Sequence, residues 1–200
     1  MIFFYGDSHA YHSFKDLSLP HGNYFQSNIT MFRVGRDKSI PNWTPSHHDA
    51  ESVICISYGE IDCRCHIQRQ VDAGREEEVV IREVVDAYMD SIRHNLREYK
   101  AVIVVGVIPP TRRYDYESQH GPITHEFPFV GTDEDRVRYT TRMNQRLNER
   151  CQLEGFLYFQ PYSYYTREDG TLRYELSDQT VHIGNNEVIR EEFRRLYEAL

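Results

Sequence analysis

The chain has 200 residues, of which 40% are hydrophobic and 27% charged, and its formal net charge is -8. This composition is that of a globular protein, and the length fits a single domain spanning residues 1–200. The excess of negative charge argues against nucleic acid or an anionic membrane as the main partner, because both select basic surfaces.

The sequence also bears on the compartment. No segment is apolar over the length needed to cross a bilayer, and the first residues lack the pattern of a signal peptide. Four cysteines without a secretory signal predict reduced thiols and a cytoplasmic location. The oligomeric state is left open by the sequence.

Short apolar runs alternate with helical patterns along the chain, which predicts an α/β fold with a parallel sheet covered on both faces. The predicted strands are Ile2–Tyr5, Thr30–Val34, Ser52–Ser57, Ala101–Val107 and Phe156–Phe159. The predicted helices run from about Glu76 to Tyr99, from Thr132 to about Leu153 before Gly155, and from about Asn186 to the end. Between them lies a long polar segment at about 111–131, which is expected to be a loop that forms a lid, a substrate wall or a solvated excursion.

The first predicted strand ends on Gly6-Asp7-Ser8-His9, which places a serine at the carboxyl edge of the sheet, where ligands of open α/β sheets bind. A serine hydroxyl becomes a nucleophile when a histidine base removes its proton and an acid orients that base. Both partners occur late in the chain, in Asp178-Gln-Thr-Val-His182, just before the last predicted helix. The pattern therefore predicts a catalytic group of Ser8, His182 and Asp178.

Several landmarks in this order resemble the SGNH (GDSL-type) hydrolases. They are Gly6-Asp7-Ser8, Gly35 after the second predicted strand, the block Gly59-Glu60-Ile61-Asp62 after the third, and Asp178 with His182. The resemblance spans nearly the whole chain. It implies a flavodoxin-like three-layer α/β/α fold with a five-stranded parallel sheet, and hydrolysis of esters or transfer of acyl groups. It also implies that the amides of Ser8 and Gly35 form part of an oxyanion hole.

Two departures from the family pattern bear on the site. The family's third block usually reads Gly-x-Asn-Asp, with the asparagine as an oxyanion donor, whereas this chain has Ile61 there. Arg64 is the first candidate to replace that donor, and the alternative is that Arg64 pairs with Glu60 or Asp62 and holds the loop. The usual Asp-x-x-His has also gained a residue, so Asp178 is either the acid that orients His182 or a turn cap.

Residues beside these landmarks are expected to support the pocket or its loops. They are Asp7, His9, Gly59, Glu60, Asp62 and His66. The other histidines considered, His12, His21, His47 and His48, show no ligand-like pairing and are expected in exposed loops. Cys63-Arg-Cys65-His66 suggests zinc, but structural zinc sites use two well-separated pairs, so no metal and no cofactor are expected.

The function expected from these residues is hydrolysis of an ester bond through an acyl-enzyme, with a carbohydrate ester or another small polar ester as substrate. An acyltransferase would use the same residues. Two further alternatives are a binding module that has lost activity, and a metallophosphoesterase of the calcineurin type. Asp7-x-His9 fits the first metal-binding element of the latter class, but the later histidine motifs of such a two-metal site are missing.

Overall fold

A computed structural model describes residues 1–96 and 98–200. Five parallel strands form one sheet in the order β2-β1-β3-β4-β5. The strands are β1 (Ile2–Gly6), β2 (His21–Phe25), β3 (Val53–Ser57), β4 (Ala101–Val105) and β5 (Leu157–Phe159). The five-stranded parallel sheet of the predicted α/β fold is therefore confirmed.

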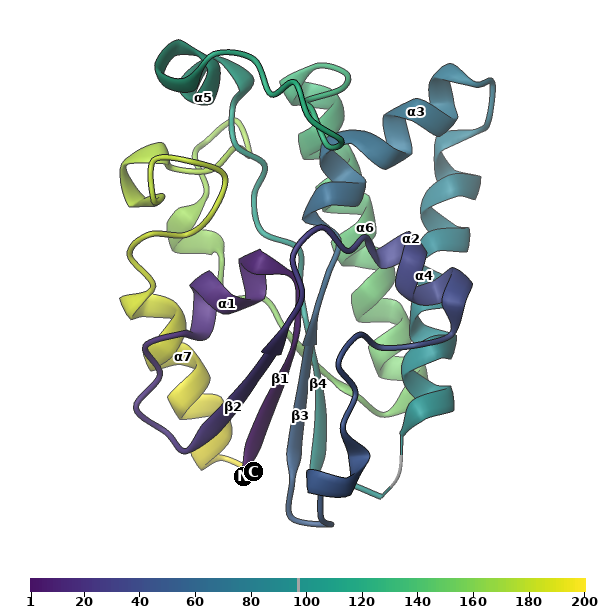
Figure 1. The fold of residues 1–200 in the computed structure, drawn as a ribbon, viewed down its shortest axis with the longest axis vertical. Helices are drawn as coiled ribbons and strands as arrows, with labels where there is room; N and C mark the ends of the chain where they lie inside the picture. Colours follow the sequence, from purple (N-terminus) through teal and green to yellow (C-terminus); the bar gives the residue numbers. More distant parts are fainter. Residues whose placement is uncertain (97) are drawn as a thin grey trace.

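Helices cover both faces of this sheet (Figure 1). They are α1 (Ser8–Phe14), α2 (Met31–Asp37), α3 (Ile67–Asp72), α4 (Glu77–Asn95), α5 (Arg113–His120), α6 (Asp133–Glu154) and α7 (Glu187–Glu198). Side chains of β1 alternate between the two faces, as strand geometry requires. Phe4 packs with Phe14 of α1 and Phe193 of α7, whereas Tyr5 belongs to the cluster that includes Tyr88 of α4. Figure 1 accordingly places α1 and α7 on one side and α2, α4 and α6 on the other.

Most of the predicted elements are present within a few residues of the expected bounds. Thr132 caps α6 through a reciprocal pair of hydrogen bonds with Asp135, and Gly155 ends this helix with a positive φ of 72°. Helix α4 ends at Asn95, before the predicted end at Tyr99. Arg97, which the prediction placed in the last turn of that helix, lies outside the described residues. Among the described residues, no helix is long and apolar enough to span a membrane.

The predicted strand over Thr30–Val34 is wrong, because this segment begins helix α2. Thr30 accepts a hydrogen bond from the amide of Arg33, and the buried carboxylate of Asp62 accepts the amides of Met31 and Phe32 at 2.6 and 3.1 Å. These caps satisfy amides that a helix leaves unpaired, so they override the strand preference of the β-branched residues. The second strand is β2 instead, which is at the edge of the sheet and is only partly buried.

Gly35 therefore does not follow a strand, and its predicted place in the oxyanion hole loses its basis. Gly35 lies inside α2, where a side chain would collide with α4: a Cβ there would lie 2.8 Å from Cβ of Ala87 and 2.9 Å from the α4 backbone. Its lack of a side chain lets the two helices approach closely.

We expect Gly35→Ala to lower the free energy of unfolding by about 1–3 kcal/mol, because the added methyl group forces α2 away from α4. Chemical denaturation measures this change. Arg36→Ala is the matched control, because Arg36 is exposed on the same helix, where it pairs with Asp37 and lies over the exposed ring of Phe32. The control should change stability by less than about 0.5 kcal/mol. Equal stability of Gly35→Ala and the parent protein would contradict the packing argument.

Candidate active site

Ser8 lies at the carboxyl edge of the central strand β1, as the first residue of α1. Asp7 precedes it as the cap of α1: the buried carboxylate accepts the amide of His9 at 2.9 Å, and the amide of Asp7 donates to the carbonyl of Ser57 in β3. These contacts fix the turn that presents the Ser8 hydroxyl. Asp7 thus supports the site through the backbone.

The loop before α7 brings His182 to Ser8 and Asp178 to His182. Nε2 of His182 lies 3.0 Å from Oγ of Ser8, and Nδ1 of His182 lies 3.0 Å from Oδ2 of Asp178. His182 is therefore within hydrogen-bond distance of both Ser8 and Asp178, although 174 positions separate Ser8 from His182.

The extra residue between Asp178 and His182 is absorbed by a tight turn. The amide of Asp178 donates to the carbonyl of His182 at 3.0 Å, and Gln179 has a positive φ of 66°. Oδ1 of Asp178 accepts the amide of Thr180 at 2.9 Å and its hydroxyl at 2.5 Å. Asp178 thus caps the turn with one carboxylate oxygen and contacts His182 with the other, so a turn cap and a contact with His182 occur together.

The pKa values in this group are shifted in the directions that favour a neutral histidine beside an ionised aspartate. Burial raises the pKa of Asp178, but hydrogen bonds from His182 and Thr180 bring it well below its ordinary value. Burial lowers the pKa of His182, and although the hydrogen bond to Asp178 opposes this, the pKa stays below its ordinary value. Nε2 of His182 is then free to accept a proton near neutral pH.

The loop after β3 forms the neighbouring wall of the site, and it continues into a π-helical turn, η2 (Asp62–His66). Gly59 begins this loop with φ of 126°, a conformation that favours glycine. Arg64 is buried, and its Nη2 lies 3.2 Å from Oε2 of Glu60. This contact agrees with the alternative in which Arg64 holds the loop, and Asp62 holds the same loop to the start of α2.

Ile61, which stands where the family has its oxyanion asparagine, packs into a small apolar cluster. It is 3% exposed and shares this cluster with Cys65, Phe127 and Val130. Two members come from the segment predicted as a loop at about 111–131. The side chain at position 61 therefore anchors that segment to the wall of the site.

The segment at 111–131 is not a loop throughout, because it contains helix α5. Its second half also contacts the loop that carries His182: Ile123 and Phe129 pack with Val181. Nε2 of His120 lies 2.6 Å from the carbonyl oxygen of Gln179. The segment is therefore fastened to both loops that border Ser8.

Sequence reasoning missed two residues that contact His182. The ring of His12 is stacked on that of His182, with centroids 4.3 Å apart and planes at 9°, and Oγ1 of Thr180 lies 3.1 Å from Nδ1 of His182. The expectation that His12 lies in an exposed loop is wrong, because His12 is half-buried in α1. This helix was not predicted. Had it been, His12 would have been found four positions after Ser8 on the same helical face.

Other predicted support residues lie in different surroundings. His66 stacks on Phe32 at 4.4 Å between ring centroids, Cys63 belongs to the main core, and Cys65 donates to the carbonyl of Ile61. Cys63, Cys65 and His66 thus face three separate environments. Among the described residues, His12, Asp178 and His182 place three ligand-type atoms within 4.8 Å of one another. Asp178 accepts hydrogen bonds in this group, whereas Nδ1 of His12 lies 3.8 Å from Oδ2 of Asp178.

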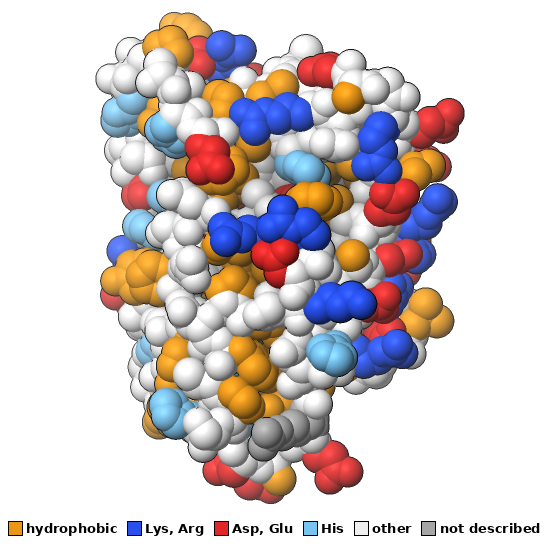
Figure 2. All heavy atoms as spheres, turned by 45° about the vertical axis from the view of Figure 1, so that its right-hand side comes forward, with side chains coloured by type: hydrophobic (Ala, Val, Ile, Leu, Met, Phe, Trp, Pro, Cys, Tyr) orange, Lys and Arg blue, Asp and Glu red, His pale blue; other side chains and the backbone are white. Residues whose placement is uncertain are grey.

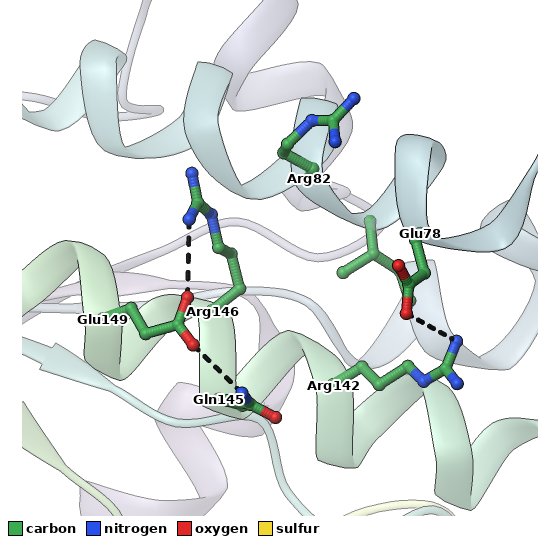
Figure 3. Close-up of a pocket in the computed structure, with 7 residues that line it drawn as sticks. Glu78, Arg82, Arg142, Gln145, Arg146 and Glu149 are labelled. Carbon is green, nitrogen blue, oxygen red and sulfur yellow. Dashed lines mark hydrogen bonds and ion pairs between the residues drawn. The ribbon is translucent and has the colours of Figure 1, made fainter.

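A separate cavity of about 210 Å³ lies between α4 and α6. Two of its arginines contact acidic side chains: Figure 3 shows Arg142 directed at Glu78, and Arg146 at Glu149. Figure 2 shows acidic and basic side chains interspersed over the face that includes these helices. The charges around this cavity serve mainly to hold α4 against α6.

No family model matches the chain, and no curated protein matches it significantly in sequence. Solved structures match nearly all of it. A protein from Streptococcus pneumonia named as a platelet activating factor is 16% identical with a TM-score of 0.68, covering 98% of this chain and 82% of its own. A GDSL-like lipase from Bacteroides thetaiotaomicron is 12% identical with a TM-score of 0.61, and the match covers 100% of this chain and 88% of the lipase chain.

A catalytic mutant of an acetylxylan esterase from Geobacillus stearothermophilus is 14% identical with a TM-score of 0.57, covering 97% of this chain and 92% of its own. At identities this low, the likeness shows the fold. The chain has the α/β fold of the SGNH hydrolases, and its structural neighbours include esterases and lipases.

Proposed function

We propose that the protein is a serine hydrolase that cleaves ester bonds through an acyl-enzyme intermediate. The observation that supports this most strongly is the chain of contacts from Ser8 Oγ to His182 Nε2 and from His182 Nδ1 to Asp178, each 3.0 Å long. A serine, a histidine and a carboxylate in this order form the arrangement that activates a hydroxyl for attack on a carbonyl.

In the proposed reaction, Oγ of Ser8 attacks the ester carbonyl while Nε2 of His182 takes the hydroxyl proton. The tetrahedral intermediate expels the alcohol, which receives that proton from His182 and leaves Ser8 acylated. Water then attacks the acyl group while Nε2 of His182 takes a proton from it. The bond between the acyl carbon and Oγ of Ser8 breaks, His182 returns the proton to Oγ, and the carboxylic acid departs. Asp178 keeps the imidazole oriented and stabilises its charged form in both steps.

The oxyanion needs donors that this chain supplies differently from the family pattern. The amide of Ser8 is one candidate, because the first amides of a helix lack partners within it. Arg64 stays the proposed side-chain donor: it is 6% exposed, and among the described residues its Nε has no hydrogen-bond partner. Gly35 is not part of this proposal, since it packs against α4.

The proposed substrate is an ester of a carbohydrate or another small polar molecule. Net charge of -8 disfavours polyanionic substrates, and one structural neighbour is an acetylxylan esterase. We propose a cytoplasmic protein that needs no metal and acts on small molecules, with neither nucleic acid nor membrane as a partner.

Turnover of p-nitrophenyl acetate and labelling by a fluorophosphonate test this proposal together. We expect turnover that a chelator does not alter, and a label that mass spectrometry locates on Ser8, because an activated serine hydroxyl attacks phosphorus as it attacks a carbonyl. Absence of both turnover and label would instead favour a binding module. Phosphodiester cleavage that a chelator abolishes would favour the metallophosphoesterase alternative.

A further inference from the structure

Three buried ionisable side chains lie in a row beside the Ser8–His182 pair. His9 is 4% exposed, and its Nε2 lies 2.9 Å from Oε2 of Glu60. The same oxygen of Glu60 lies 3.2 Å from Nη2 of Arg64. Glu60 is 5% exposed and Arg64 is 6% exposed, so all three groups are shielded from solvent. Charges in such a buried place interact more strongly than they do in water.

His9, at one end of this row of side chains, contacts the ring of His182. The centroids of His9 and His182 are 4.6 Å apart, with their planes at 44°. The other groups that face His182 are Asp178 at Nδ1, the stacked ring of His12, and more distantly Glu60. His9 is therefore one of two histidine rings in contact with the proposed base.

The pKa values of the two neighbouring histidines are shifted in opposite directions. Burial lowers the pKa of His9, but the carboxylates of Glu60 and Asp7 outweigh it and raise the pKa above its ordinary value, although Arg64 opposes them. Burial and the neighbouring His182 lower the pKa of His12 to about 4. These shifts favour the protonated form of His9 beside His182 and the neutral form of His12.

Glu60 keeps its charge in this surrounding. Burial raises its pKa, but Arg64 and His9 lower it to about 2. A buried carboxylate at ion-pair distance from a histidine favours the protonated form of that histidine.

We propose that His9, held by Glu60 and Arg64, is a positioning residue that acts through its positive charge on His182 and keeps that imidazole unprotonated into mildly acidic solution. A cation 4.6 Å away disfavours a second cation, so less protonated His182 is present at a given pH. The inference rests on the proposed function, in which only neutral His182 accepts the proton of Ser8.

The experiment is an NMR titration of protein labelled with ¹⁵N in its histidine rings, which measures protonation without any substrate. In the parent protein we expect His182 to titrate below pH 6.5 and His9 to carry protons on both ring nitrogens at pH 7. A neutral His9 at pH 7 in the parent protein would overturn the proposal, and this measurement needs no variant to fold.

His9→Gln then removes the charge and keeps an N–H donor for Glu60. We expect the titration midpoint of His182 to rise by about one pH unit, a tenfold change in proton affinity. The acid limb of kcat/KM should move to higher pH by the same amount. An unchanged midpoint in this variant would refute the proposed charge effect.

His12→Gln is the matched control, because His12 contacts the same ring at 4.3 Å without a charge at neutral pH. In this variant we expect the titration midpoint of His182 to stay within about 0.3 pH units of the parent value. An equal shift in both variants would trace the effect to packing and overturn the proposal. A midpoint shift in His9→Gln alone, in a protein without ester turnover, would support the charge effect and reject the proposed function.

Discussion

Ser8→Ala is expected to lower kcat/KM for an activated ester by about 10³- to 10⁶-fold, since the hydroxyl that forms the acyl-enzyme is gone. The free energy of unfolding should change little, because among the described residues the Ser8 hydroxyl has a hydrogen-bond contact with His182 alone. Steady-state kinetics and chemical denaturation of the same preparation measure the two quantities.

His182→Ala should cause a loss of similar size, because the hydroxyl and its base act as one unit. The double variant tests whether the two residues act as one unit: its kcat/KM should be no lower than that of the slower single variant. If the two losses multiply instead, Ser8 and His182 contribute independently, and the acyl-enzyme route proposed above is wrong.

Asp178→Asn is expected to lower kcat by about 10⁴-fold while the fold stays intact. The amide keeps an oxygen for the hydrogen bonds from Thr180, so the turn is preserved. Its NH₂ group would then donate to Nδ1 of His182, which moves the imidazole proton to Nε2. Nε2 would then face Ser8 with a hydrogen and could not accept the serine proton.

Thr180→Ala is the control for this prediction, because it removes the hydroxyl bonded to Asp178 and leaves the carboxylate in place. We expect less than a tenfold loss in kcat for the control. If Asp178→Asn also loses less than tenfold, Asp178 serves the turn alone. Circular dichroism of both variants distinguishes a chemical loss from an unfolded loop.

The sequence predicts the central strands and the distant partners of Ser8 because these depend on local patterns. Continuous apolar runs such as Ile2–Tyr5 signal buried strands, and the Asp178…His182 spacing is visible by inspection. The edge strand β2 was missed because it is only partly buried, and its pairing partner, β1, decides its structure. The apolar signal is correspondingly weak there.

The errors around α2 have a different origin. Its start depends on Asp62, whose carboxylate reaches it from 31 positions away. No window of local sequence contains that interaction, so β-branched residues suggested a strand and Gly35 was placed after it. The same error hid the purpose of Asp62, which sequence reasoning could name only as support for the pocket.

The apolar cluster around Ile61 constrains how this site could change. An asparagine at position 61 would put an amide among Cys65, Phe127 and Val130, where burial without hydrogen-bond partners costs free energy. Recovery of the family's usual donor by one substitution would therefore loosen the anchored segment. An asparagine at position 61 would therefore need compensating changes at Phe127 and Val130 to keep the segment packed against the wall of the site.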